Sequence, residues 1–267
     1  MKVLRKSLAT AAVAALTLAG AAKASCGKTG AGFETWKSQF AQEARQAGVG
    51  QRGLQALAGA QYATRTISAD RNQKSFRYSL EKFMEIRGSA TIVAQGRKRK
   101  ARNAEFYDWI ERSYGVPAGV LIAIHGMETA FGGFMGDSSV VSAIVTLTYD
   151  CRRSDFFKPH AIGALKLVDN GSITLNTKGA KHGELGHTQF LPGNALKYGV
   201  DGNQDGEVDF YNQTDALVST ANFLRQKGWQ PGKGYQEGQP NFAVIQAWNA
   251  AGVYQKAIAI MAAQIDR

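Results

Sequence analysis

The chain has 267 residues, of which 44% are hydrophobic and 20% are charged. This balance supports one large or two small cores and excludes an intrinsically disordered chain. The formal net charge is +11, and removing the four basic residues of the first 24 leaves +7, which suits a polyanionic partner.

Residues 1–24 are predicted to form a secretory signal peptide. They combine a basic start, a short apolar run and the small-x-small site AKA at 22–24. Cys26 raises the possibility of a lipid anchor, but Lys23 interrupts the small residues that normally precede a lipid-modified cysteine. We therefore expect residues 25–267 to be exported to the periplasm without a lipid anchor, and no later segment has the pattern of a membrane span.

Two cysteines, Cys26 and Cys151, are the only ones in the chain. In an oxidising compartment they are expected to pair, and closing so long a loop stabilises the fold by about 4 kcal/mol in the chain-entropy model. The alternative is two unrelated thiols. No second set of metal ligands accompanies them, which argues against a zinc site.

Apolar spacing of three and four residues predicts a mainly α fold. The expected helices cover 33–48, 103–115, 117–131, 214–229 with Thr214 as its cap, and one or two helices within 241–265. GSITLNT (171–177) is the best short strand candidate. The basic run GRKRKAR (96–102) is interpreted as a solvated helix face or a contact with an anionic cell-wall polymer rather than with nucleic acid.

Glu128 is the unusual residue of the helix predicted over 117–131. Val120, Ile124 and Glu128 are four residues apart, so the carboxyl lies on the stripe that otherwise faces the core, near the helix C-terminus. Burial and the negative end of the helix dipole both disfavour its ionised form. The expected raised pKa suits a general acid, although a buried Glu paired with an Arg would have the same sequence pattern.

Several segments together resemble the lytic murein transglycosylase B family. YGVPAGVLIAIHGMETAFG (114–132) is similar to the segment that carries the family's catalytic glutamate. GHTQFLPGNALKYGVDGNQDGEVDFYNQTDALVSTANFLRQKGW (186–229) resembles its Gln-Phe-x-Pro segment, acidic loop and following helix. Segments near 33–49 and 248–258 also match, so the resemblance covers nearly the whole mature chain.

The resemblance implies a lysozyme-like catalytic core, about 103–267, preceded by an N-terminal helical part, about 30–102. It implies cleavage of the β-1,4 bond between N-acetylmuramic acid and N-acetylglucosamine in peptidoglycan. Glu128 would act first as acid and then as base, forming a 1,6-anhydro ring without water. A single catalytic carboxyl suffices for that reaction, whereas ordinary glycosidases need two.

The same resemblance places substrate-binding groups at Gln189, Asn249 and Tyr254, and a paired arginine at Arg152 and Arg153. Taken alone, these would be a core amide, helix caps and surface charge. Three positions differ from the family pattern: Ala180 replaces a common Ser, Trp248 replaces a common Tyr, and Cys151 replaces a common Pro. Two hydroxyl contacts are therefore expected to be missing. Glu184 is the rival carboxyl, interpreted as a loop or salt-bridge residue.

The acidic loop 201–215 has EF-hand-like spacing. Asp201, Asn203 and Asp205 hold positions 1, 3 and 5, Gly206 follows at the turn, and Glu207 offers its carbonyl. Position 12 is Asn212, and the resemblance implies Asp215 as the later ligand. These residues predict a structural Ca²⁺ site, with an ordinary acidic turn as the alternative.

Three functional hypotheses follow from the sequence. The first is an exported, monomeric peptidoglycan lytic transglycosylase that acts on glycan strands, uses no organic cofactor and binds no nucleic acid. The second is a hydrolytic, lysozyme-like muramidase. The third is a catalytically silent cell-wall binding protein.

Overall fold

The computed structural model describes residues 25–72 and 78–267; the predicted signal peptide lies outside them. Helices dominate the described chain. In chain order the elements are η1 (Gly30–Gly32), α1 (Phe33–Gln46), α2 (Gln51–Gly59), α3 (Thr64–Arg71), α4 (Leu80–Ile86), α5 (Ser89–Arg102), α6 (Ala104–Tyr114), α7 (Ala118–Thr129), β1 (Ser138–Ser139), α8 (Val140–Tyr149), α9 (Ser154–Asp169), β2 (Lys178–Gly179), α10 (Pro192–Tyr198), α11 (Gln213–Gln226), α12 (Phe242–Trp248) and α13 (Gly252–Asp266).

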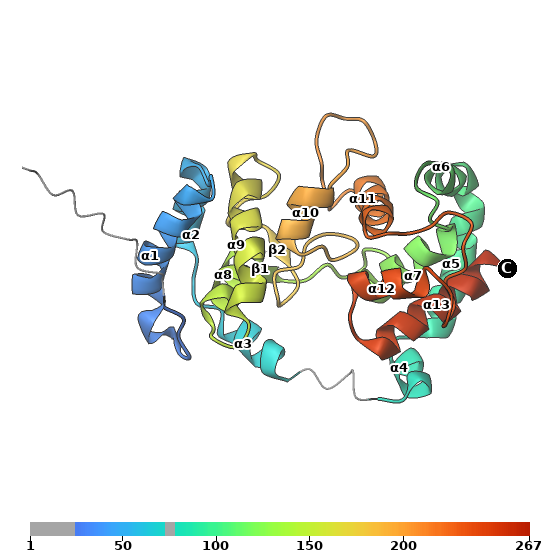
Figure 1. The fold of residues 1–267 in the computed structure, drawn as a ribbon, viewed down its shortest axis with the longest axis horizontal. Coiled ribbons are helices and arrows are strands. Elements are labelled where there is room, and N and C mark those ends of the chain that lie inside the picture. The colour runs from blue at the N-terminus through green and yellow to red at the C-terminus, as the bar shows by residue number, and fades with distance from the viewer. Residues whose placement is uncertain (1–24, 73–77) are drawn as a thin grey trace, which may run out of the picture.

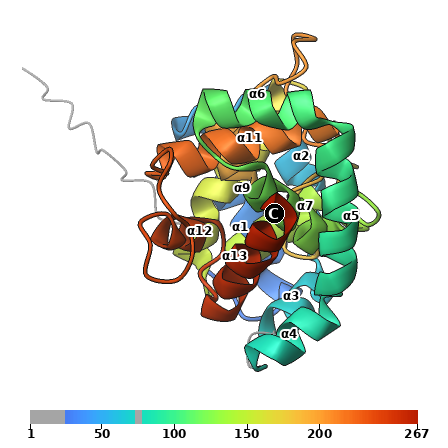
Figure 2. The same ribbon diagram turned by 90° about the vertical axis from the view of Figure 1, so that its right-hand side faces the viewer.

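The helices form an elongated body with α7 near one end and α9 nearer the other (Figure 1). Helices α1 and α2 lie beside α8 and α9, whereas α5 and α13 pack on α7 (Figure 2). Nearly every residue of α7 is buried, as expected for a helix that is apolar on all sides. The N-terminal third of the chain is therefore shared between the two ends of the molecule.

The predicted helices are present, with differences at their ends. The helix expected over 117–131 stops at Thr129, because Ala130 and Phe131 adopt positive φ values of 48° and 63°. The cap of α11 is Asn212 and not Thr214: the Asn212 side chain accepts a hydrogen bond from the Thr214 N–H at 2.8 Å. The segment 241–265, expected to hold one or two helices, forms two, α12 and α13.

The predicted strand over 171–177 is wrong. This segment is a loop closed by its own threonines, since Thr174 N–H donates to Thr177 Oγ1 at 2.9 Å and Asn176 N–H donates to Thr174 Oγ1 at 3.2 Å. Such local hydrogen bonds compete with a strand ladder. The sheet pairs β1 with β2 antiparallel, Ser138 opposite Gly179.

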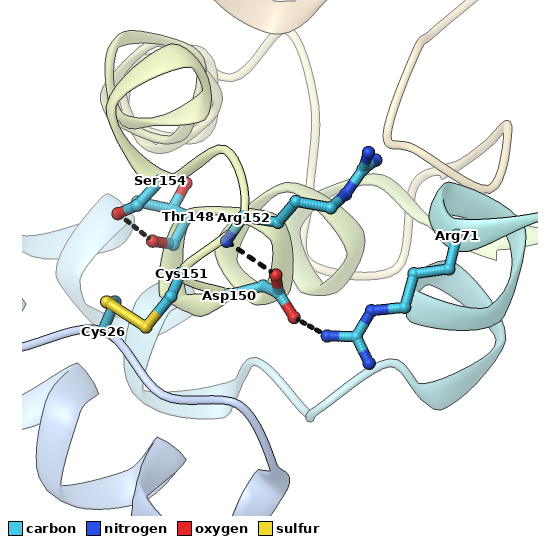
Figure 3. The surroundings of a disulfide bond; sticks show 7 residues. All are labelled: Cys26, Arg71, Thr148, Asp150, Cys151, Arg152 and Ser154. Carbon is cyan, nitrogen blue, oxygen red and sulfur yellow. Dashed lines mark hydrogen bonds and ion pairs between the residues drawn. A yellow bond between two sulfur atoms is a disulfide. The ribbon is translucent and has the colours of Figure 1, made fainter.

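Cys26 and Cys151 form the predicted disulfide (Figure 3). The bond joins the N-terminal segment to the turn between α8 and α9. Backbone hydrogen bonds support it: Gly27 N–H donates to the Tyr149 carbonyl at 3.0 Å, and Cys151 N–H donates to the Gly27 carbonyl at 3.2 Å. The first described residues are thus fixed to the middle of the chain.

The basic run lies on α5, and part of it contacts the protein itself. Arg97 donates to the Gln264 carbonyl at 2.8 Å, Lys100 pairs with Asp266 at 2.8 Å, and the Arg99 guanidinium lies 4.3 Å from the centre of the Phe131 ring. These three side chains attach α5 to neighbouring segments. Within the described residues, we find no helix with the length and apolar character needed to cross a membrane.

Candidate active site

A pocket of about 600 Å³ is lined by residues of α9 and α10 on one side and of α12 and α13 on the other. Five of the six catalytic and substrate-binding residues predicted from the sequence line it: Glu128, Arg153, Gln189, Asn249 and Tyr254. Glu184 and Ala180 line it as well, whereas Arg152 does not. Segments more than 120 residues apart in sequence thus converge on one cavity.

Glu128 lies in the last turn of α7, and its Oε1 is held by two donors. The Tyr254 hydroxyl donates to Oε1, and the Trp248 Nε1–H donates to the same atom at 3.1 Å. Burial raises the pKa of Glu128 to about 7, the two hydrogen bonds oppose that rise, and the neighbouring Glu184 adds to it. The carboxyl is therefore poised to lose or gain a proton near neutral pH.

Packing fixes both donors. The Trp248 indole stands edge-on between Phe190 and Phe223, with ring centroids 5.1 and 5.3 Å away. Tyr254 is buried in the first turn of α13, and Phe83 of α4 meets its ring edge at 6.3 Å. Burial and the adjacent Glu128 raise the pKa of the Tyr254 hydroxyl, which keeps it a donor.

Trp248 is the residue whose role the sequence missed. It was expected only to lack a hydroxyl contact, yet its indole N–H supplies a hydrogen bond to the carboxyl of Glu128. Asn249 follows it, and the Asn249 Oδ1 accepts the Ala251 N–H at 3.0 Å, which shapes the turn into α13. Arg87, from the end of α4, also lines the pocket and was not predicted.

Gln189 and Glu184 belong to one tight loop. Leu185 and Phe190 exchange backbone hydrogen bonds at 2.9 and 3.0 Å, and the intervening Gln189 adopts a φ of 56°, which is unusual for a residue with a side chain. Its Nε2 donates to the Gly186 carbonyl at 2.8 Å. Burial raises the pKa of Glu184, whose Oε2 accepts the His182 N–H at 3.2 Å.

Arg152 and Arg153 both bind Asp70 of α3. Arg152 Nε donates to Asp70 Oδ2 at 2.6 Å, and Arg153 Nη2 donates to Oδ1. Burial disfavours the Asp70 carboxylate, but these hydrogen bonds outweigh it and hold the pKa of Asp70 below its usual range. Of the pair, Arg153 alone reaches the pocket, and Arg152 is a structural link to α3.

The acidic loop is closed by hydrogen bonds to its own backbone. Asp201 accepts the N–H groups of Asp205 and Gly206, and Asn203 Oδ1 accepts the Asp205 N–H at 3.1 Å. Asp215, which is fully buried, accepts three backbone N–H groups of residues 202, 203 and 209. The donor chemistry suits calcium, but in the part of the chain described no three acidic, His or Cys side chains converge on a metal position, so the predicted site is not confirmed.

Known proteins share both sequence and fold with this chain. Residues 32–239 match the family model described as transglycosylase SLT domain. Membrane-bound lytic murein transglycosylase B of Escherichia coli K12 is 34% identical over 121 residues, which cover 45% of this chain and 34% of that protein. The chain thus aligns with about a third of this curated relative.

Solved structures resemble the fold over a longer stretch. SltB3 of Pseudomonas aeruginosa, solved in complex with NAG-NAM-pentapeptide, has a TM-score of 0.78 and 27% identity, covering 86% of this chain and 78% of that one. The lytic transglycosylase Slt35 of Escherichia coli, solved in complex with calcium, has a TM-score of 0.74 and 20% identity, covering 91% of this chain and 96% of that one, and supports the lysozyme-like fold alone. Because the family model spans most of the chain, this protein belongs to the transglycosylase SLT domain family.

Proposed function

We propose that this chain is a periplasmic lytic transglycosylase that cleaves the β-1,4 bond between MurNAc and GlcNAc in peptidoglycan and leaves a 1,6-anhydroMurNAc end. The observation that carries the proposal is the Glu128 carboxyl, with a pKa of about 7, in a pocket large enough for sugar rings. SltB3, a relative of the same fold, binds a peptidoglycan fragment and supports the substrate class.

The hydrogen bonds of Glu128 support different tasks for its two oxygens. Oε1 accepts from both Tyr254 and Trp248, so it is disfavoured as the site of the acidic proton, which is left to Oε2. Oε2 donates that proton to the bridging oxygen as the glycosidic bond breaks. The resulting carboxylate then takes the proton of the muramyl C6 hydroxyl as that oxygen bonds to C1, which closes the anhydro ring and restores the acid.

The neighbouring groups bind and orient the sugar. Gln189 is fixed through its Nε2, which leaves its Oε1 for a hydroxyl or acetamido N–H. Asn249 offers its side-chain amide N–H₂ to the pocket, since its Oδ1 is held by the chain. Arg153 and Arg87 give the walls positive charge for carboxylates of the lactyl or stem-peptide groups.

Hydrolysis is the competing function, because Glu184 places a second carboxyl in the same pocket. A hydrolase of the inverting or retaining type requires that carboxyl as base or nucleophile. Transglycosylation does not require it. Burial raises the pKa of Glu184, which disfavours the carboxylate that a base or nucleophile needs.

Glu128→Gln tests the assignment of the acid. We expect the variant to keep its fold and its binding to peptidoglycan strands while losing nearly all turnover, because an amide neither donates nor recovers the proton. Mass spectrometry of digested sacculi measures the product. Substantial anhydro product from a folded Glu128→Gln protein would move the acid to another residue.

Glu184→Gln is the matched control. We expect anhydro ends to remain the main product and the rate to fall by less than about tenfold. Loss of a true acid–base catalyst would lower the rate by at least about a hundredfold. A hydrolysed end is heavier than an anhydro end by one water. Hydrolysed ends that vanish with Glu184→Gln would establish the muramidase, and wild-type binding without any sugar product would establish a silent wall-binding protein.

Export, the boundary after residue 24 and the division near residue 102 are part of the same proposal. The N-terminal sequence pattern and the Cys26–Cys151 disulfide support export, since disulfides persist in oxidising compartments. We also propose calcium as a structural ligand of the loop 201–215 with no role in bond cleavage. Its support is the Asp201, Asn203 and Asp205 spacing and the calcium complex of Slt35.

Thermal melts test the calcium proposal. If the loop binds calcium, the melting temperature rises as the calcium concentration passes the dissociation constant. The Asp201→Ala, Asp205→Ala double variant should show no such rise. Superimposable wild-type curves in EDTA and in millimolar calcium would leave the loop as an ordinary acidic turn.

A further inference from the structure

Phe156 is a large apolar side chain that is exposed to solvent at the wall of the pocket. It is 53% exposed although it lines the cavity, in the first turn of α9. The other exposed large apolar side chains of the described residues, such as Phe134 at 70% exposed, lie outside this pocket. Full burial of a phenylalanine side chain contributes about 2 kcal/mol, and half-exposed Phe156 lacks part of it. An exposed apolar ring inside a pocket is typical of a site that a ligand covers.

The Phe156 ring is held in place by its neighbours. Phe157 meets it edge-on at 5.0 Å between centroids, and the His160 ring packs against it at 5.4 Å and 60°. The Arg153 guanidinium lies 5.9 Å from its centre, and Arg153 is itself anchored to Asp70. Burial lowers the pKa of His160 to about 4, so the ring beside Phe156 is uncharged at neutral pH. A fixed aromatic face loses little side-chain entropy when a ligand stacks on it.

Phe156 and the residues that hold Glu128 line the same pocket but come from different helices. Phe156 comes from α9, whereas Trp248 and Tyr254, which hold the Glu128 carboxyl, come from α12 and α13. A pocket of about 600 Å³ has room for more than the bond being cut. The C–H face of a pyranose ring is apolar and flat, and it suits the negative face of an aromatic ring.

We propose that Phe156 is the stacking platform for one sugar ring of the bound glycan and so a specificity-determining residue for glycan strands; this rests on the proposed function. The platform binds the saccharide itself and not the stem peptide. It adds affinity and takes no part in the proton transfers.

Binding in a Glu128→Gln background tests the platform, because the ligand is then not consumed. The probes are soluble peptidoglycan strands of a few disaccharides, with and without stem peptides, measured by isothermal titration calorimetry. We expect Phe156→Ala to weaken both probes by about five- to tenfold, which lies within the contribution of one aromatic contact. Phe156→Tyr should restore affinity, and Phe134→Ala, the exposed control outside the pocket, should leave it unchanged.

The kinetic readout in the active enzyme separates a platform from a structural role. Phe156→Ala should raise KM by a similar factor and leave kcat within about twofold, because the ring supplies neither a proton nor a hydrogen bond to Glu128. Unchanged affinity for both probes, or a loss confined to peptide-bearing strands, overturns the platform while the proposed function stands. If the folded Glu128→Gln protein binds neither probe, the proposed function fails first and the platform with it.

Discussion

Glu128 owes its chemistry to two opposed effects at one residue. Burial favours the neutral acid, and the hydrogen bonds from Tyr254 and Trp248 favour the carboxylate, which leaves the pKa at about 7. An acid–base catalyst needs both forms within reach, since each is used once per turnover. As pH rises through this value the protonated fraction of Glu128 falls, so under the proposed mechanism the proton donation to the glycosidic oxygen sets the alkaline limb of the rate profile.

Trp248→Phe should move that alkaline limb upward. The variant keeps an aromatic ring between Phe190 and Phe223 but removes the N–H that stabilises the Glu128 carboxylate, so the pKa of Glu128 rises by up to about one pH unit. The pH dependence of kcat/KM on sacculi measures the shift. Tyr254→Phe should shift the limb in the same direction, and a downward shift in both would contradict the hydrogen-bond assignment.

The helical spacing of Val120, Ile124 and Glu128 was enough to predict a buried carboxyl, because α7 is apolar on all sides. The donors to that carboxyl could not be found in the same way. Trp248 reaches Glu128 across 120 residues, and the direction of its N–H depends on how α12 packs on Phe190 and Phe223. Asn249 and Tyr254 were placed near the acid by resemblance alone, and no sequence pattern indicated that Arg152 and Arg153 would both bind Asp70.

At the scale of elements, periodicity predicted α1, α6, α7, α11 and the α12–α13 segment, but it did not single out α2 to α5 or α8 to α10. The wrong strand prediction at 171–177 has a local cause, because threonine is common in both strands and turns. Here the hydroxyl oxygens of Thr174 and Thr177 accept backbone N–H groups of the segment and so stabilise a loop. The disulfide followed from the cysteine count and the expected compartment. No pattern in the sequence, by contrast, indicated that α4 would reach the active-site pocket.

The disulfide should contribute strongly to the stability of the α8–α9 turn and the N-terminus. Cys26 and Cys151 are 125 residues apart, so removing the bridge frees a long loop in the unfolded chain and costs about 4 kcal/mol. We expect the Cys26→Ser, Cys151→Ser double variant to melt about 10 °C lower by calorimetry. A reducing agent should lower the wild-type transition and leave that of the double variant unchanged; coincident melts of the two proteins would refute this role.

Asp215 should stabilise the acidic loop with or without metal. Its buried carboxylate accepts three backbone N–H groups, and Asp215→Ala leaves them without that acceptor at a cost of about 1–3 kcal/mol. Urea denaturation in EDTA measures the change. Asp209→Ala is the control, since Asp209 is exposed and its side chain accepts one N–H, from Tyr211; an equal loss in both variants would argue against the special role of Asp215.

At the scale of the whole molecule, a few long-range links join the two ends. The N-terminal helices α1 and α2 pack on α8 and α9, while α4 and α5 pack at the other end, on α13 and, for α5, on α7. The Asp70 cluster ties α3 to the turn that carries Arg152, Arg153 and the disulfide. Arg153 also lines the pocket. The Arg153–Asp70 pair therefore affects both the attachment of α3 and the charge of the candidate active site.

Asp70→Asn should therefore weaken the whole fold in a pH-dependent way. Asp70 is buried while its arginines are 44% and 35% exposed, so we expect a loss of about 1–3 kcal/mol at pH 7, below the cost of breaking a fully buried pair. The folded pKa of Asp70 is depressed, so its contribution is complete above the unfolded pKa of about 4 and disappears as pH falls through the folded value. The difference in unfolding free energy between wild type and Asp70→Asn should thus stay constant from about pH 8 to about pH 5 and shrink in more acidic solution.

Chemical denaturation at neutral pH and at several acidic pH values measures this difference. Asp137→Asn, which breaks the exposed Arg65–Asp137 pair, is the control and should change stability by less than about 1 kcal/mol; a gap for Asp70→Asn that widens in acid would overturn the assignment.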